Sequence, residues 1–195
     1  MEKIDFKFVA AKEGGQILDG YVPRQNGIAI GNSGVTVATG VDIGQMNIAD
    51  INSLAISETL KKKLHPYALV TKSAAIKLLT EKPLRITREE ATELDNAMQK
   101  RIFLPMIRAY NRESVVPFSR IPSQAQTVLA SLAWHRGPGF YKFKAFRGIW
   151  NCAVYQNWEG MADELRAYQT AVRGIRNRRH QEARLIDKIG TTALV

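Results

Sequence analysis

The sequence predicts an α+β fold in which a small N-terminal lobe carries a β-hairpin and a larger lobe is helical. One observation is that residues 11–45 hold eight of the fourteen glycines in the chain, together with its clearest strand pattern. The other is that apolar residues recur at helical spacing through the rest of the chain. At 195 residues the chain fits one domain, which we divide into lobes at 1–60 and 61–195. We expect a cleft between the lobes, where functional sites are common.

The first predicted helix lies in "DFKFVAAKEGG", directly before the glycine-rich segment. Asp5 is expected to cap its N-terminus, and Gly14 or Gly15 to end it, so Glu13 falls on its last turn. Further on, the alternation around Val35 and a turn at Gly31–Gly34 predict the hairpin. We find no other convincing strand signal in the sequence.

The remaining elements are predicted to be helices. The pattern "TREEATELDNAMQKRIFLPMIRAYN" begins with a capping box, Thr87 to Glu90, and should kink at Pro105. A second box, Ser123 to Gln126, begins the helix that we expect to be the most buried. The other expected helices span 49–55, 57–64, 71–81, 140–155, 158–168 and 172–188.

The net charge of +10 is concentrated late in the chain. Residues 1–45 carry about −1, residues 46–100 carry +2 and residues 101–195 carry +9. A basic half suggests an anionic partner, and nucleic acid, a membrane surface and a cell wall all fit this description. The arginine-rich segment 173–184 can also be interpreted as a solvated helix face, in which Arg178 or Arg179 pairs with Glu182.

The glycine-rich segment displays Glu13, and its glycines supply the turns that would bring Thr36 and Asp42 back toward this residue. The partial negative charge at a helix C-terminus favours a protonated carboxyl at Glu13, which could then act as a general acid. Two carboxyls facing a gap are the arrangement that glycosidases use. Each residue also has an ordinary structural explanation: a solvated glutamate, a threonine of high β-propensity and an aspartate in a turn.

Four stretches of the chain carry a family resemblance, two in the opening segment and two later: "KEGG" at 12–15, "GNSGVTVATGVDIGQ" at 31–45, "ASLAWHRGPG" at 130–139 and "RGIRNRRHQEARLI" at 173–186. Through them the sequence resembles the phage-lysozyme-like muramidases, most closely the branch of pesticin-type toxin domains. The resemblance implies a lysozyme-like fold. It also implies that Glu13 is the catalytic acid and that Thr36 and Asp42 are its partners.

The chain departs from standard phage lysozymes at the second carboxylate. Those proteins have an aspartate between the glutamate and the threonine, where this chain has Val22. Asp19 is the nearest acidic residue, and we choose Asp42 over it. No residue is assigned to sugar binding, and no cluster of residues has metal-ligand spacing.

The resemblance implies a muramidase that cleaves the β-1,4 bond between N-acetylmuramic acid and N-acetylglucosamine in peptidoglycan, without a cofactor. The alternative is a non-enzymatic basic module that binds nucleic acid or the cell envelope. The single cysteine, Cys152, excludes an internal disulfide, and the N-terminus does not resemble a signal peptide. We therefore expect a monomer made in the cytoplasm, which acts in the periplasm or on the cell wall after an export or membrane-perforating partner releases it. Whether it is a phage endolysin, a secreted toxin or a virion enzyme stays open.

Overall fold

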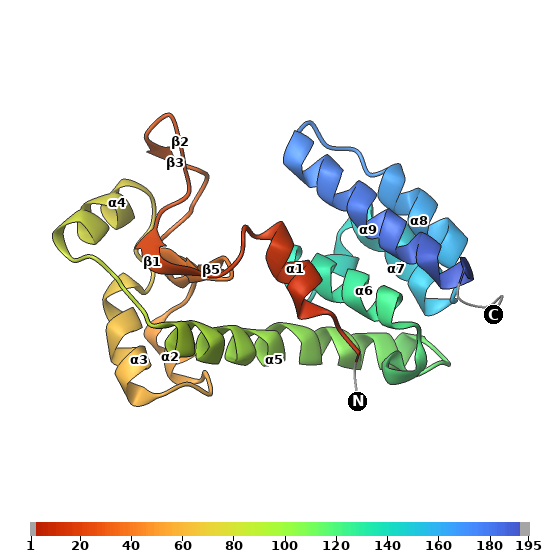
Figure 1. The fold of residues 1–195 in the computed structure, drawn as a ribbon, viewed down its shortest axis with the longest axis horizontal. Coiled ribbons are helices and arrows are strands. Elements are labelled where there is room, and N and C mark those ends of the chain that lie inside the picture. The colour runs from red at the N-terminus through yellow and green to blue at the C-terminus, as the bar shows by residue number, and fades with distance from the viewer. Residues whose placement is uncertain (1–2, 192–195) are drawn as a thin grey trace. The chain divides into compact units, whose positions relative to one another are not determined.

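The computed structural model describes residues 3–191 and has the predicted α+β composition (Figure 1). It contains two compact units. One unit joins the chain up to Lys12 with the chain from Ile102 onward, and the other spans Glu13–Arg101. The cleft expected between two lobes stays a prediction. Among the described residues, no helix has both the length and the apolar character needed to cross a membrane.

The 13–101 unit contains the sheet that positions the candidate site. Strands β1 (Ile17–Tyr21), β4 (Thr36–Ala38) and β5 (Val41–Asp42) form an antiparallel sheet in the order β1-β4-β5. Strands β2 (Arg24–Gln25) and β3 (Ile28–Ala29) form a separate two-stranded sheet.

Two details of the strand prediction are wrong. The segment Gly31–Gly34 does not close a hairpin, because it connects β3 to β4, which belong to different sheets. Strand β1 was not predicted at all, since Asp19 and Gly20 interrupt its apolar pattern. Tertiary contact stabilises it instead: the Gly20 N–H donates to the Leu84 carbonyl at 2.8 Å. A β-carbon on Gly20 would lie 2.9 Å from the Leu84 β-carbon, so only glycine permits this close packing.

Helices complete this unit, and their ends follow local signals. The predicted capping box at the start of α5 is confirmed, with Glu90 N–H to Thr87 Oγ1 at 3.2 Å and Thr87 N–H to Glu90 Oε2 at 2.9 Å. The elements are η1 (Ile43–Gln45), α2 (Ile48–Asn52), α3 (Glu58–Leu64), η2 (His65–Tyr67), α4 (Lys72–Glu81) and the first part of α5 (Arg88–Glu113). Helix α5 continues through Pro105.

The other unit is helical in the described residues. It contains α1 (Phe6–Lys12), the rest of α5, η3 (Phe118–Arg120), α6 (Ser123–Arg136), η4 (Phe140–Lys142), α7 (Lys144–Val154), α8 (Trp158–Arg166) and α9 (Arg173–Thr191). The prediction that α6 is deeply buried is confirmed, since every residue from Ala125 to Ala133 is buried. Its predicted capping box is wrong: Pro122 is the N-cap, and the Gln126 amide donates to the Ile121 carbonyl at 3.0 Å.

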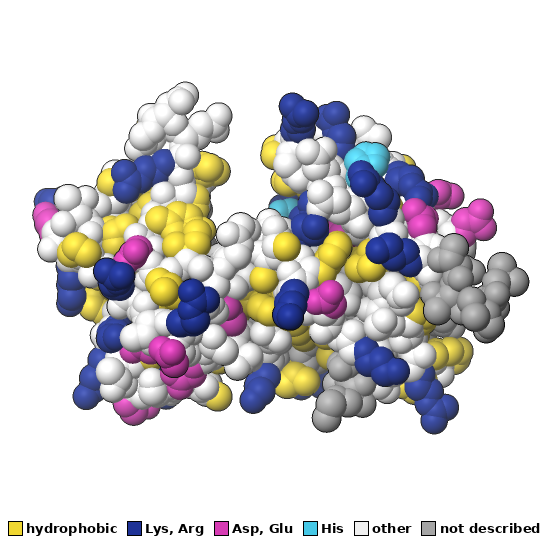
Figure 2. Space-filling view, in the orientation of Figure 1, with side chains coloured by type: hydrophobic (Ala, Val, Ile, Leu, Met, Phe, Trp, Pro, Cys, Tyr) yellow, Lys and Arg dark blue, Asp and Glu magenta, His cyan; other side chains and the backbone are white. Residues whose placement is uncertain are grey.

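The arginine-rich helix α9 is not simply a solvated face. Arg178 and Arg179 pair with Glu182 as expected, but all three side chains are buried. Ser131 of α6 also donates to Glu182 Oε1 at 2.6 Å, so the ion cluster joins the two helices. Other arginines of α9 are exposed, and Figure 2 shows Lys and Arg side chains gathered over this helix.

Candidate active site

Glu13 follows directly after α1, at the point where the chain leaves the helix. Asp5 caps the start of α1, because its Oδ1 accepts from the Phe8 N–H at 3.2 Å. The helix ends at Lys12, and the next two glycines, Gly14 and Gly15, have φ of +83° and +85°. Only glycine adopts this left-handed conformation without strain, which explains the "GG" after the glutamate. Glu13 itself is half-buried.

The tight turn between β4 and β5 lies against the Glu13 carboxyl group. Gly40, in this turn, has φ of +70°, and a β-carbon there would lie 3.3 Å from Glu13 Oε2. Gly40 is therefore required both by its backbone conformation and by its contact with the carboxyl.

Three side chains form a row across the three-stranded sheet. Thr36 of β4 pairs with Tyr21 of β1 on one side and with Asp42 of β5 on the other. Residues directly opposite each other in antiparallel strands project from the same face, so all three side chains share one face of the sheet. Thr36 is buried, and its hydroxyl donates to the Gly34 carbonyl at 3.3 Å.

Backbone N–H groups hold the carboxylate of Asp42. The Gly34 N–H lies 3.1 Å from each carboxylate oxygen, and the Gly44 N–H donates to Oδ1 at 3.0 Å. Burial raises the pKa of Asp42, while these backbone hydrogen bonds lower it. The net shift is upward, so this carboxylate takes up a proton more readily than an ordinary aspartate does.

Tyr21 lies in the same cross-strand row as Thr36 and Asp42, and its pKa responds to both predicted carboxyls. Burial raises the pKa of its hydroxyl, and the negative charges of Glu13 and Asp42 raise it further. The 13–101 unit therefore brings Glu13, Thr36 and Asp42 to one part of the sheet, where both carboxyls act on the Tyr21 hydroxyl. Tyr21 was missed in the sequence, where a tyrosine in an unpredicted strand gives no signal.

The alternative acidic residue does not join this group. The Asp19 side chain is 73% exposed and pairs with Arg85 at 3.4 Å. Its backbone also forms a β-bridge with Arg85, so it lies at the edge of β1 away from β4. Val22, at the position of the standard lysozyme aspartate, is a core residue with 4% exposure.

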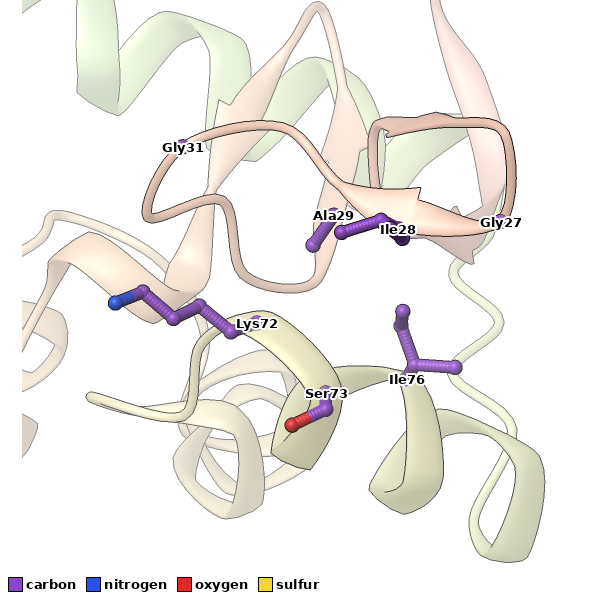
Figure 3. A pocket seen from close by; sticks show the side chains of 7 residues that line it. All are labelled: Gly27, Ile28, Ala29, Gly31, Lys72, Ser73 and Ile76. Atoms are coloured by element: carbon purple, nitrogen blue, oxygen red, sulfur yellow. The ribbon is translucent and has the colours of Figure 1, made fainter.

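A cavity of about 330 Å³ lies elsewhere in the same unit, between β3 and α4. Ile28 and Ile76 face each other across it, and Lys72 and Ser73 lie at the start of α4 (Figure 3). No carboxylate lines it, so it does not include the predicted catalytic residues. Within residues 3–191, no group of three His, Cys, Asp or Glu side chains is placed to hold a metal ion.

Comparison with known proteins extends the resemblance found in the sequence. A search of curated proteins gives no match. A family model, Pesticin, described as "Bacterial toxin homologue of phage lysozyme, C-term", matches residues 3–159. This range is most of the chain and includes Glu13, Thr36 and Asp42. The chain therefore belongs to the pesticin family of phage-lysozyme homologues, and its class of activity is that of a lysozyme-like glycoside hydrolase.

Proposed function

We propose that the protein is a muramidase that hydrolyses the β-1,4 bond between N-acetylmuramic acid and N-acetylglucosamine in peptidoglycan. The observation that carries the proposal is that the Glu13 carboxyl lies against Gly40, in the turn that leads directly into Asp42 of β5. The charges of Glu13 and Asp42 also both raise the pKa of the Tyr21 hydroxyl. A buried threonine, Thr36, lies in the same cross-strand row. Membership of a lysozyme-like family supports the same substrate class.

In the proposed mechanism, Glu13 is the general acid and donates its proton to the glycosidic oxygen as the bond to the anomeric carbon breaks. Asp42 and Thr36 position a water molecule, whose oxygen attacks that carbon while its proton passes to Asp42. The raised pKa of Asp42 suits this role, because it makes the carboxylate a stronger base.

We further propose that the reaction inverts the anomeric configuration. Inverting enzymes hold their carboxyls about 6.5–9.5 Å apart to admit a water, and retaining enzymes hold them about 5–5.5 Å apart. In an inverting mechanism, Asp42 accepts a proton from the attacking water and forms no covalent bond to the sugar. The anomeric form of the first product, measured by NMR during digestion, distinguishes the two outcomes.

The test is digestion of purified peptidoglycan with the wild-type protein and with Glu13→Gln, which keeps the side-chain shape and removes the acid. We expect new N-acetylmuramic acid reducing ends from the wild-type protein. The variant should be slower by about 10²- to 10⁴-fold, the usual contribution of acid catalysis. Glu81→Gln is a matched control, because Glu81 is exposed on α4. Binding without new reducing ends would favour the non-enzymatic alternative, and an equally active Glu13→Gln would exclude Glu13 as the acid.

A further inference from the structure

A buried aspartate outside the predicted catalytic group contacts the segments around Glu13. Asp95 lies on α5 and is only 4% exposed. Its Oδ1 accepts from the Thr39 N–H at 3.0 Å. Its Oδ2 accepts from the Thr39 hydroxyl at 2.7 Å and from the Gln16 amide at 2.9 Å.

A core position filled by an apolar side chain would need none of these hydrogen bonds. Burying a carboxylate costs free energy unless it is well compensated, and the three donors to Asp95 are neutral groups. Asp95 also lies in a buried stripe of α5 with Ala91 and Leu94. An apolar side chain would fit such a stripe at lower cost. The carboxylate therefore suggests a role beyond filling the core.

The two partners of Asp95 flank Glu13 on both sides. Gln16 is the first residue after the Gly14–Gly15 pair that follows the glutamate. Thr39 directly precedes Gly40, whose α-carbon lies against the Glu13 carboxyl. One carboxylate thus ties together the segment that carries Glu13 and the turn on which Glu13 rests.

Glycines make both segments intrinsically flexible. Gly14, Gly15 and Gly40 permit the required left-handed turns, but glycine has more conformational freedom to lose than any other residue. A general acid displaced by about 1 Å can lose roughly 10²-fold in rate. A contact from α5 to both segments would therefore help to keep Glu13 in one place.

We infer that Asp95 is a positioning residue, which holds Glu13 in its catalytic position through Gln16 and Thr39. The inference rests on the proposed role of Glu13 as the general acid. Asp95 would not touch the substrate, and it would act only by fixing the two glycine-containing segments.

The first test compares Asp95→Leu with Asp95→Asn on a soluble peptidoglycan glycan. Leucine has the same branching and the same number of side-chain heavy atoms as aspartate, and it removes all three hydrogen bonds. Asparagine can restore them, because its oxygen accepts from the Thr39 N–H and its amide can donate to the Thr39 hydroxyl and to a reversed Gln16 amide. We expect kcat to fall about 10- to 100-fold in Asp95→Leu with KM changed less than about threefold. Asp95→Asn should recover most of kcat.

Leu94→Ala is the matched control, because it destabilises the same turn of α5 without removing these bonds. Each variant is measured well below its own unfolding temperature. An undiminished kcat in Asp95→Leu would overturn the inference. An equal loss in Asp95→Asn or in Leu94→Ala would also overturn it, because each would point to charge or to general stability instead.

Amide hydrogen exchange gives a second readout that does not depend on activity. In Asp95→Leu, exchange at residues 14–16 and 39–40 should become faster, while Asp95→Asn should keep the wild-type rates. Unchanged exchange in Asp95→Leu would refute the anchoring. If the wild-type protein cleaves no glycan, the proposed function fails, and the exchange result still decides whether Asp95 anchors these segments.

Discussion

The contact between Gly34 and Gly44 predicts that Gly34→Ala will displace the Asp42 carboxylate. A β-carbon on Gly34 would lie 2.5 Å from the Gly44 α-carbon and 2.6 Å from the Val70 carbonyl oxygen. It would also lie 2.9 Å from Asp42 Oδ1. Two of these atoms are backbone, so the clash cannot be relieved by rotating a side chain. Gly34 does not have a left-handed φ, so alanine would be disfavoured there only by steric overlap and not by backbone strain.

The expected loss of stability follows from these distances. Ordinary van der Waals contact begins at 3.4 Å, so the two backbone segments must separate by several tenths of an ångström to nearly 1 Å. Overpacking of this kind costs about 1–3 kcal/mol. Stretching the backbone hydrogen bonds to the Asp42 carboxylate adds about 1.5–3 kcal/mol for one bond to a charged group. The total of about 2.5–6 kcal/mol would lower Tm by at least about 5 °C in a protein of this size.

Thermal unfolding followed by circular dichroism measures the stability change, and peptidoglycan digestion below Tm measures the loss of activity. The control is Gly174→Ala, because Gly174 lies in α9 without a left-handed φ, and a β-carbon added there would meet no atom within 4 Å. That variant should be more stable by up to about 1 kcal/mol. A Gly34→Ala protein with wild-type Tm and activity would refute the argument that this contact holds Asp42.

Three further predictions concern charge. Asp42→Asn should reduce digestion by about 10²-fold or more while leaving Tm equal or higher, since burial already disfavours the charged carboxylate. Burial lowers the pKa of His135 from 6.5 to about 3, so the unfolded chain takes up a proton that the folded chain does not. The free energy of unfolding should therefore fall between about pH 6.5 and pH 3, and His135→Phe should weaken this dependence in urea titrations at pH 7 and pH 5. Replacing Arg173, Arg176 and Arg184 by glutamine should slow the clearing of whole cell walls at low salt, while cleavage of a short soluble glycan should not change. An equal effect on both substrates would contradict envelope binding.

Local signals in the sequence were sufficient for most of the helices. The capping box Thr87–Glu90 and the deep burial of α6 depend on residues close together in the sequence, and both predictions are confirmed. The box at Ser123 has the same pattern but is not formed, because the Gln126 side chain bonds to the Ile121 carbonyl instead. The side-chain oxygen of Gln126 also accepts from the Lys3 N–H. This partner lies 123 residues away, so no local rule could identify it.

The candidate site was only partly predictable for the same reason. Glu13, Thr36 and Asp42 fall in one short segment, and a family resemblance could select them. Tyr21 joins the site only through the pairing of β1 with β4. Asp95 joins it through a hydrogen bond to Thr39, which lies 56 residues away in the chain. Asp95 did leave one usable signal: a carboxylate aligned with Ala91 and Leu94 on the apolar side of a helix is unusual enough to suggest a buried partner.

Net charge in the sequence also differs from charge on the surface. Residues 101–195 carry fifteen basic and six acidic side chains, but Arg178, Arg179 and Glu182 among them are buried together, away from the surface. Removing one member of such a cluster leaves an uncompensated buried charge. A variant of Arg178 or Arg179 would therefore be destabilised, and its activity would not measure binding to the envelope. The excess positive charge of the half-chain still lies mainly on its surface, and α9 contributes to it through its exposed arginines. Tests of envelope binding must therefore use exposed arginines, since only these can reach an anionic polymer and respond to salt.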